Sequence, residues 1–415
     1  MTVDVSKLTP VLLGADLNCY NVVRAFHEEY GIKSYAFGRY ASAPTKYSSL
    51  IHFTPVEHLD TDDVMLDILT KFRDEHAEDN LILFACNDEY SDVFARIKDK
   101  LPEYTFPYPK LELRGDLSRK AEFSDICDKY GVPHPATVVF NKPAPSSDLS
   151  EEALGFSYPV VIKPSSSIKY WQHPFEGMDK VFFSKNPEES EKIIEKIFAS
   201  GYDDKIVVQE TIAGGDSQMR VLTCFSDANA KVRAVCLGNT MVEEHVPSAI
   251  GNHAAIVTEP VSNFPQMQNI INMLEDIGYV GFSNFDMKLR EGTDDDFSVF
   301  EINLRQGRSN YYMTGSGLNV AKLAVEKFND TDHDDCIFCE NEHFWHHVPK
   351  AIAFSYCESP KLLEKAKELD RSGNVSCSLL YKPDLGLNFK RRFMVWAQMF
   401  RQYKKFRDWY PTKNK

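Results

Sequence analysis

Short apolar runs alternate with helix-like segments along the first part of the chain. The stretch TPVLLGADLNCYNVVRAFHEEYGIKSYAFG predicts a buried strand, a turn at Gly14, an amphipathic helix and a second strand at residues 34–37. The stretch NLILFACNDEY predicts another buried strand with a polar turn after it, and SDVFARIKDKL continues as a helix. Strands that alternate with helices predict a doubly wound α/β domain with a parallel sheet, which we expect to span residues 1–112.

Polar side chains follow the predicted strands of this domain. A doubly wound sheet binds its ligands at the carboxyl ends of its strands, which places Asp16, Asn18 and the CNDEY turn on the candidate binding edge. A dinucleotide site needs the spacing G-x-G-x-x-G, and Gly14 stands without it. The pattern therefore disfavours a nicotinamide-dependent dehydrogenase.

The middle of the chain changes to a mixed pattern of helices and strands. LSRKAEFSDICDKYG predicts a helix that stops at Gly131, and YPVVIKPSSS predicts a strand that ends at Lys163 in a loop of small residues. Further on, a helix is predicted for NPEESEKIIEKIFASG and another for GLNVAKLAVEKF. A strand is predicted for KIVVQETIAGGDSQMRVLTCF, and we expect its second half to pair with AKVRAVCLG. We expect an α+β domain over residues 113–330 and a C-terminal appendage over residues 331–415.

The stretch FDMKLREGTDDDFSVFEINLRQGRSN, residues 285–310, predicts a hairpin of two alternating strands. The apolar residues expected on one face are Phe285, Met287 and Leu289 in the first strand and Phe300, Ile302 and Leu304 in the second. If the connection turns between Thr293 and Asp294, each residue of the first strand pairs with the residue of the second strand at the same distance from that point, so that the two residue numbers always have the same sum. This register sets Asp286 opposite Glu301.

Two opposed carboxylates on one face of a hairpin need an explanation. Their Cβ atoms lie only about 5 Å apart, so the two charges repel. A hard divalent ion such as Mg²⁺ prefers one or two carboxylates together with phosphate oxygens, and Asn303 on the same face supplies a third oxygen. A solvated hairpin with acidic side chains in water is the alternative, and the hairpin alone leaves both open.

Lys163 is a second candidate for chemistry. It lies inside the apolar run PVVIKP, where an unpaired ammonium is costly to bury, and a charge at a strand end beside a loop suits ligand binding. Lys120 is open to either interpretation, because a lysine in a helix is commonly exposed.

Composition places the chain among soluble globular proteins. Of its 415 residues 43% are hydrophobic and 26% charged, and no apolar run approaches the ~20 residues that span a bilayer. Nine cysteines without a framework fit a reducing compartment, so we expect a cytoplasmic location. A net charge of −14 argues against general nucleic-acid binding.

The C-terminal segment carries the opposite charge. Residues 388–415 hold nine Lys and Arg and one acidic residue, which leaves 38 basic and 60 acidic residues elsewhere. Helical spacing in NFKRRFMVWAQMFRQYKKFRDWYP places five aromatic residues on one stripe: Phe389, Phe393, Trp396, Phe400 and Tyr403. This pattern suits a peripheral membrane-surface helix or a helix docked on the protein's own core, and docking is the commoner outcome.

A zinc site is conceivable in HDDCIFCENEHFWHH. Cys336 and Cys339 could join two of the histidines at positions 333, 343, 346 and 347. A single C-x-x-C lacks the second spaced pair of a typical zinc motif, and the default is an acidic turn that leads into a strand.

Five motifs follow one another over about two hundred residues: SRKAEF…YGVPHPAT, YPVVIKPSSS, VVQETIAGGD, FSNFDMK and FEINLRQGRSN. In this order they resemble the ATP-grasp superfamily of carboxylate–amine ligases. The opening stretch, the length and the basic, aromatic C-terminus resemble the bacterial D-aspartate ligases within it. The resemblance implies an ATP-grasp fold, in which an N-terminal doubly wound domain precedes two subdomains that clasp ATP.

The resemblance also implies roles for individual residues. Those implied to bind ATP are Lys120, Lys163, the loop residues Ser165, Ser166 and Ser167, Glu210 and Ile212 at the adenine edge, and Asp216 at the ribose. Those implied to hold Mg²⁺, or Mn²⁺ in its place, are Asp286, Glu301 and Asn303. The loop is serine-rich where the family has glycine, and Asp216 stands where many relatives have glutamate.

Three arginines are candidates to hold an acyl phosphate and a carboxylate, because a guanidinium grips both with paired hydrogen bonds. They are Arg305, Arg220 and Arg308, of which Arg305 has the clearest counterpart in the family. The alternative for each is a surface ion pair.

The implied reaction joins D-aspartate to the lysine side chain of a peptidoglycan precursor, a UDP-linked muramyl peptide, through an acyl phosphate. An ATP-grasp ligase that joins other amino acids or makes a small peptide-like metabolite remains open, and so does a non-catalytic ATP sensor.

Overall fold

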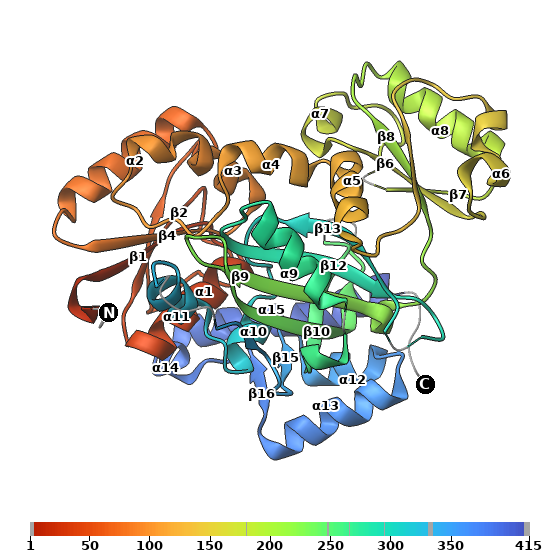
Figure 1. The fold of residues 1–415 in the computed structure, drawn as a ribbon. Coiled ribbons are helices and arrows are strands. Elements are labelled where there is room, and N and C mark those ends of the chain that lie inside the picture. The colour runs from red at the N-terminus through yellow and green to blue at the C-terminus, as the bar shows by residue number, and fades with distance from the viewer. Residues whose placement is uncertain are drawn as a thin grey trace.

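The computed structural model describes residues 4–179, 181–246, 249–264, 266–293, 295–330 and 335–410. An N-terminal α/β domain lies on one side of a large twisted sheet, and a smaller sheet with its own helices projects from the other side (Figure 1). The C-terminal helices pack below the large sheet in this view. This mixture of a parallel sheet and antiparallel sheets confirms the predicted α/β and α+β fold class.

The N-terminal domain is built as the alternating pattern predicts. Its parallel sheet has the strand order β3-β2-β1-β4, with β1 (Leu8–Leu13), β2 (Ser34–Gly38), β3 (Ile51–Pro55) and β4 (Asn80–Ala85). The helices between and after these strands are α1 (Leu17–Tyr30), α2 (Asp62–Glu75) and α3 (Asp88–Ile97). Gly14 turns the chain from β1 to α1 at a φ of +147°, and a Cβ there would lie 2.7 Å from the Cβ of Cys86. Only glycine allows this close approach of the two turns.

The smaller sheet follows two helices, α4 (Leu111–Ser118) and α5 (Lys120–Tyr130). Its strands are antiparallel in the order β5-β8-β6-β7, with β5 (Thr137–Phe140), β6 (Val160–Pro164), β7 (Phe182–Ser184) and β8 (Ile206–Glu210). The helices of this part are α6 (Glu151–Leu154), α7 (Ser167–Trp171) and α8 (Pro187–Ala199). It has a hydrophobic core of its own, which includes Val160, Ile162, Ile194 and Val208.

The large sheet holds eight strands within the described residues. Seven follow the order β13-β12-β9-β10-β11-β15-β16, and β14 pairs with β10. Their bounds are β9 (Met219–Ser226), β10 (Val232–Glu244), β11 (Asn252–Glu259), β12 (Gly281–Leu289), β13 (Phe297–Asn303), β14 (Ile337–Phe338), β15 (Phe344–His346) and β16 (Val375–Cys377).

One predicted strand is divided between the two sheets. The segment expected as a single strand over residues 205–225 forms β8 in the smaller sheet and β9 in the larger one. Gly214, at a φ of +105°, and the short turn Asp216–Gln218 break the extended chain between them. The connection therefore carries the chain from one sheet to the other.

Helices cover the large sheet and join it to the N-terminal domain. They are α9 (Met267–Asp276), α10 (Tyr311–Gly315), α11 (Val320–Lys322) with the π-helical turn Leu323–Lys327, α12 (Lys350–Tyr356), α13 (Pro360–Ser372), α14 (Lys382–Leu385) and α15 (Phe389–Trp409). One buried cluster includes Phe26 of α1, Phe225 of β9, Tyr312 of α10 and Val395 of α15. The regions on either side of the expected boundaries at residues 112 and 330 thus share a core, and the boundaries stay a prediction.

The C-terminal helix α15 docks on the protein, but not through its aromatic stripe. Its buried side chains are Arg391, Val395, Gln402 and Phe406, whereas the five stripe residues are all exposed. Arg391 is fully buried and forms an ion pair with Asp384 at 2.8 Å. Because a buried arginine is costly without its partner, this ion pair keeps the face of α15 that carries Arg391 packed against the protein. None of the described helices is both long enough and apolar enough to cross a membrane.

Candidate active site

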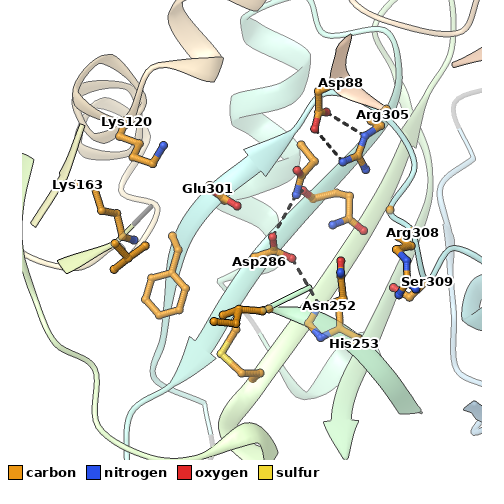
Figure 2. A pocket seen from close by; sticks show the side chains of 18 residues that line it. Asp88, Lys120, Lys163, Asn252, His253, Asp286, Glu301, Arg305, Arg308 and Ser309 are labelled. Atoms are coloured by element: carbon orange, nitrogen blue, oxygen red, sulfur yellow. Dashed lines mark hydrogen bonds and ion pairs between the residues drawn. The ribbon is translucent and has the colours of Figure 1, made fainter. Parts of the chain in front are cut away.

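A cavity of about 310 Å³ is lined by residues from both sheets and from the N-terminal domain. Seven predicted site residues line it: Lys120, Lys163, Asp286, Glu301, Asn303, Arg305 and Arg308. The lysines project toward it from the side of the smaller sheet, and the carboxylates from the large sheet (Figure 2). The structure thus brings together cationic and anionic groups that lie far apart in the sequence.

The opposed carboxylates lie in the predicted register. Asp286 of β12 pairs with Glu301 of β13, and Asn284 pairs with Asn303. The Nδ2 of Asn303 donates a hydrogen bond to Asp286 Oδ2 at 3.1 Å. Two acidic side chains and an amide therefore occupy one face of the hairpin, in the cavity.

The register shifts just beyond this pair, and the shift changes the cavity. Met287 pairs with Val299, where a regular hairpin would pair it with Phe300. Such a bulge turns the extra residue to the other face, so Phe300 lines the cavity and Val299 is buried instead. The prediction that Phe300 shares the core face is wrong. Its ring centroid lies 5.7 Å from the Nζ of Lys163.

His253 of β11 is a cavity residue that the sequence analysis missed. Its Nε2 lies 3.5 Å from Asp286 Oδ1 and its Nδ1 lies 3.2 Å from Glu243 Oε1. Burial disfavours the imidazolium, but the two carboxylates outweigh burial and raise the pKa of His253 to about 10. The acidic cluster thus already holds one cationic partner. No motif marks this histidine, because β11 is brought to the site only by the fold.

The predicted phosphate-covering loop is ordered around the end of β6. Ser165 is buried, and its Oγ accepts a hydrogen bond from the backbone N–H of Ala121 at 3.3 Å. Ser166 caps α7 through the backbone N–H of Lys169, and Ser167 is the first residue of that helix. Ser165 and Ser166 are not among the described residues that line the cavity.

The predicted adenine hinge also lies outside the cavity lining. The Glu210 carboxylate contacts Arg290 at 2.6 and 3.0 Å, and this arginine lowers the pKa of Glu210. Ile212 is buried in the connection that follows β8. Arg290 therefore fixes the end of β8 against the strand β12 that carries Asp286.

Asp216, the predicted ribose ligand, is buried and already bonded. Its carboxylate accepts hydrogen bonds from the backbone N–H of Glu243 at 2.8 Å and from the hydroxyl of Tyr410 at 2.5 Å. His245 Nε2 lies 3.1 Å from Asp216 Oδ1. Burial opposes the carboxylate, but these bonds outweigh it and lower the pKa of Asp216. The end of α15 is thus tied to the connection between the two sheets.

Two of the predicted arginines reach the cavity with acidic partners. Arg305 forms an ion pair with Asp88 of the N-terminal domain, with both contacts at 2.9 Å. Arg308 lies 3.6 Å from Glu244 at the end of β10. Asp88 belongs to the CNDEY turn, so the edge expected to bind ligands does face the cavity.

The other residues of that edge have structural partners. Asp16 caps α1 by accepting from the backbone N–H of Cys19 at 3.2 Å. Asn18 Nδ2 donates to the carbonyl of Cys86 at 2.9 Å, and its Oδ1 accepts from Asn310 at 2.8 Å. Asn18 therefore joins the N-terminal domain to the segment that follows Arg308.

Arg220 lies away from the cavity. It is buried, and it pairs with Glu259 at 2.8 Å and with Asn239 Oδ1 at 2.9 Å. This ion pair links β9 to β11 and faces a separate groove lined by α13. The structure does not bring Arg220 together with Arg305 and Arg308.

The conceivable zinc ligands are dispersed. Cys339 Sγ lies 3.1 Å from Ser316 Oγ, His343 bonds Ser376 at 2.7 Å, and His346 bonds the carbonyl of Val348 at 2.7 Å. Within the described residues no group of three His, Cys, Asp or Glu side chains is arranged to hold a metal ion. His333 lies outside the described residues.

Solved structures share this architecture. The chain resembles the L-amino acid ligase from Bacillus licheniformis, with a TM-score of 0.55 and 14% identity over 79% of this chain and 76% of that one. It also resembles phosphoribosylamine–glycine ligase from Thermotoga maritima, with a TM-score of 0.55 and 16% identity over 81% and 78%. The biotin carboxylase domain of the Hydrogenobacter thermophilus 2-oxoglutarate carboxylase, in complex with MgADP, gives a TM-score of 0.58 and 14% identity over 80% and 73%. These likenesses confirm the ATP-grasp fold.

The chain belongs to the ATP-grasp superfamily of carboxylate–amine ligases, and it is an ATP-dependent carbon–nitrogen ligase. No protein-family model matches it. Within the superfamily it belongs to the family of the D-aspartate ligase of Enterococcus faecium (strain Aus0004). The two proteins are 32% identical over 422 aligned residues, which cover 99% of each chain.

Proposed function

We propose that the enzyme binds Mg-ATP in the cavity and joins D-aspartate to an amine through an acyl phosphate. The observation that carries the proposal is the cavity itself, where two lysines face a pair of opposed carboxylates beside Arg305. Full-length similarity to a D-aspartate ligase supports the choice of the acid.

The residues on the hairpin fit a hard divalent cation. Asp286, Glu301 and Asn303 offer only carboxylate and amide oxygens, the donor set that Mg²⁺ or Mn²⁺ prefers. The contact of His253 Nε2 with Asp286 Oδ1 at 3.5 Å supports a cation-binding role for this carboxylate. Held there, the ion would offset negative charge that develops on the transferred phosphoryl group.

Lys120 and Lys163 offset the charge of the nucleotide phosphates from the opposite side. Phe300 and Met219 supply apolar surface in the same cavity for the base. The adenine edge at Glu210 and Ile212 and the phosphate loop at Ser165, Ser166 and Ser167 stay predictions, which require the smaller sheet to approach the larger one. For Asp216 to hold a ribose, its bonds to Tyr410 and His245 have to open.

The chemistry needs no covalent attachment to the protein. A carboxylate oxygen of the acid attacks the γ-phosphorus of ATP and ADP leaves, which gives an acyl phosphate. Arg305 and Arg308, which line the cavity, would hold the acyl phosphate and the second carboxylate of D-aspartate by paired hydrogen bonds. The acceptor amine then attacks the acyl carbon, loses a proton and displaces inorganic phosphate, so the rate depends on positioning and charge stabilisation.

We further propose that the side-chain carboxylate of D-aspartate is activated and that the acceptor is the lysine of a UDP-linked muramyl peptide. A ligase for other amino acids is the second candidate, because it would use the same cavity with a different acid pocket. All nine cysteines lie within the described residues and carry free thiols, which supports a cytoplasmic location.

The test measures ADP and phosphate release from the purified protein with Mg-ATP, D- or L-aspartate and a lysine-containing UDP-linked muramyl pentapeptide. Mass spectrometry should find a product heavier by one aspartyl residue, with D-aspartate only. Turnover with other acids or amines would keep the ligase chemistry and replace the substrates. Absence of ADP release across a broad panel of acids and amines would contradict the proposal.

A further inference from the structure

Five aromatic side chains form an exposed row on α15. Phe389, Phe393, Trp396, Phe400 and Tyr403 are between 47% and 74% exposed, and we call this row the aromatic stripe. Neighbouring rings are in contact, with centroid distances of 6.0 Å from Phe393 to Trp396 and 5.7 Å from Trp396 to Phe400. Leu387, two residues before the first residue of α15, is 87% exposed. Contiguous apolar surface of this kind marks an interaction site.

The helix is fixed to the protein through its other face. Arg391 pairs with Asp384 and donates to the carbonyl oxygens of Ala43 and Lys46 at 3.1 and 3.2 Å. At the other end of the helix, the ring of Phe406 packs on Tyr356 and Tyr410. Rolling the stripe inward would expose Phe406 and leave Asp384 buried without its arginine, which is costly. The stripe is therefore a stable outer surface of the folded protein.

Basic side chains flank the stripe on both sides. At about 100° per residue, Arg392 and Lys404 lie about 60° to either side of the mean direction of the five rings. Lys390 and Arg401 follow beyond Lys404, and all four are exposed. Lys46, from the segment before β3, lies next to Tyr47, whose carbonyl accepts from Asn388 at the start of α15.

We propose that α15 is a membrane-surface helix, which places its aromatic stripe in the interface of an anionic bilayer. Aromatic rings favour the boundary between headgroups and acyl chains, while flanking Lys and Arg side chains reach lipid phosphates. The charge supports this partner, because residues 388–415 are strongly basic in a chain that is otherwise acidic. The opposite face stays docked on the protein, so the helix lies along the surface of the bilayer.

Two other partners fit the stripe less well. A second copy that packs stripe against stripe would bring the basic flanks of both copies together, and like charges at such a contact repel. A single-stranded nucleic acid needs separate rings on which its bases can stack. Trp396 and Phe400 already stack on each other, at an interplanar angle of 18°.

Cosedimentation of the full-length protein with large unilamellar vesicles tests the proposal. Phosphatidylcholine vesicles are compared with vesicles that contain 30% phosphatidylglycerol, at low and high salt. We expect binding to the anionic vesicles that weakens as salt rises, and a blue shift of tryptophan fluorescence. No binding to anionic vesicles at low salt would overturn the proposal.

Matched variants assign the contact. The stripe variant is Phe393→Ser/Phe400→Ser, and the charge variant is Lys390→Gln/Arg392→Gln/Lys404→Gln. Each should lower the partition coefficient onto anionic vesicles at least about tenfold. For the charge variant, the reason is that one basic residue near an anionic surface contributes about fivefold. The controls remove exposed residues elsewhere, as Tyr40→Ser/Phe338→Ser and Lys33→Gln/Lys100→Gln/Lys185→Gln, and should bind as the wild type does. All ten substituted residues of the variants and their controls are exposed, so thermal unfolding like that of the wild type should show that every variant is folded.

Equal binding by the stripe variant and the wild type would overturn the proposal. Analytical ultracentrifugation gives a further arm of the test. A dimer that the stripe variant dissociates, together with absence of vesicle binding, would assign the stripe to a second copy instead. Failure of ligase activity leaves this test intact, because vesicle binding is measured without substrates.

Discussion

The opposed carboxylates of the hairpin dominate the site at the scale of single residues. Asp286 and Glu301 are paired across β12 and β13, where like charges destabilise a hairpin by a few tenths to about 1 kcal/mol. A protein keeps such a pair when a cation compensates the repulsion. His253 does so in part at Asp286, to which the neutral amide of Asn303 also donates a hydrogen bond. A divalent ion would complete the compensation.

Glu301→Gln should abolish metal-dependent turnover while the protein stays folded. The amide keeps the shape of the side chain but removes one negative charge from the proposed metal site. We expect kcat to fall at least about a hundredfold, or about 2.7 kcal/mol in the barrier. Steady-state ADP release against Mg²⁺ concentration measures the effect. Glu291→Gln, in the exposed turn of the same hairpin, is the control. Full activity of folded Glu301→Gln would remove Glu301 from the metal site.

Lys163→Ala should weaken nucleotide binding about tenfold or more. The variant loses a charge that faces the phosphates in the proposed complex, and it loses a contact with Phe300. Together they are worth about 1.4 kcal/mol or more. Calorimetric titration with ADP and Mg²⁺ gives the Kd. Lys185→Ala, an exposed lysine beyond β7, should bind as the wild type does, and an unchanged Kd for Lys163→Ala would exclude this lysine from the site.

The sequence predicts residues that repeat a pattern and misses those that the fold alone brings in. The predicted pair of Asp286 and Glu301 is confirmed, but the symmetric turn assumed for it is wrong: next to the connection Leu289 pairs with Phe297, one residue off that symmetry, and the bulge restores the predicted register at Asp286. Phe300 was misplaced because a bulge leaves no mark in the alternation. His253 comes from a separate strand, and its only signal would be a polar residue in a buried β11, which resembles many structural histidines.

At the scale of elements, α15 shows how a helix selects its inner face. The hydrophobic pattern favours burial of the aromatic stripe, yet a buried arginine and its carboxylate orient the helix the other way. Asp384 also accepts from Tyr20, Ser48 and Ser49, all at 2.8 Å. A sequence shows Arg391 as one of many basic residues, because its partner in α14 becomes apparent only after folding.

Arg391→Ala should destabilise the protein by about 3–5 kcal/mol, because it leaves Asp384 buried without its cation. Urea unfolding followed by circular dichroism measures the loss. Arg392→Ala, the exposed neighbour on the same helix, should change the stability by less than about 0.5 kcal/mol. The double variant Arg391→Leu/Asp384→Leu should lose less unfolding free energy than the single variants Arg391→Leu and Asp384→Leu lose together. Equal stability of Arg391→Ala and Arg392→Ala would contradict the anchoring role.

The contact between the end of α15 and Asp216 should depend on pH. The Asp216 carboxylate raises the pKa of His245 above its usual 6.5. Hydrogen bonds from His245, Tyr410 and the backbone of Glu243 lower the pKa of Asp216 below 3.8. Protonated His245 therefore stabilises the fold fully below pH 6.5, and this contribution is lost as pH rises through the raised pKa of the folded state. Ionised Asp216 stabilises the fold above pH 3.8, and this contribution is lost as pH falls through the lowered pKa of the folded state.

Thermal unfolding between pH 6 and pH 9 tests the histidine part. The wild type should lose about 1 kcal/mol or less relative to His245→Gln as pH rises over this range, since His245 is partly exposed. His52→Gln, at an exposed position of β3, should follow the wild type. Parallel curves for the wild type and His245→Gln would show that the imidazolium contributes nothing.

At the scale of the whole molecule, the cavity unites three regions that the sequence separates. Asp88 comes from the N-terminal domain, Lys163 from the smaller sheet and Glu301 from the large sheet. The sequence predicts the elements of each region because their periodicity is local. It does not predict that one expected strand divides between two sheets, since the division is fixed by the turn around Gly214 and by packing on both sides.

A ligand that contacts all three regions should protect all three from local opening. Mg-ADP at a hundred times its Kd stabilises the bound form by about 2.7 kcal/mol, or about a hundredfold in any opening that abolishes binding. Hydrogen exchange should therefore slow in β6, at the start of α3 around Asp88 and in the β12–β13 hairpin together. In Glu301→Gln the Mg²⁺-dependent part of this protection should disappear, and in Glu291→Gln it should remain. Protection confined to the hairpin would show that the nucleotide does not bridge the regions, so the smaller sheet and the N-terminal domain would have no part in binding it.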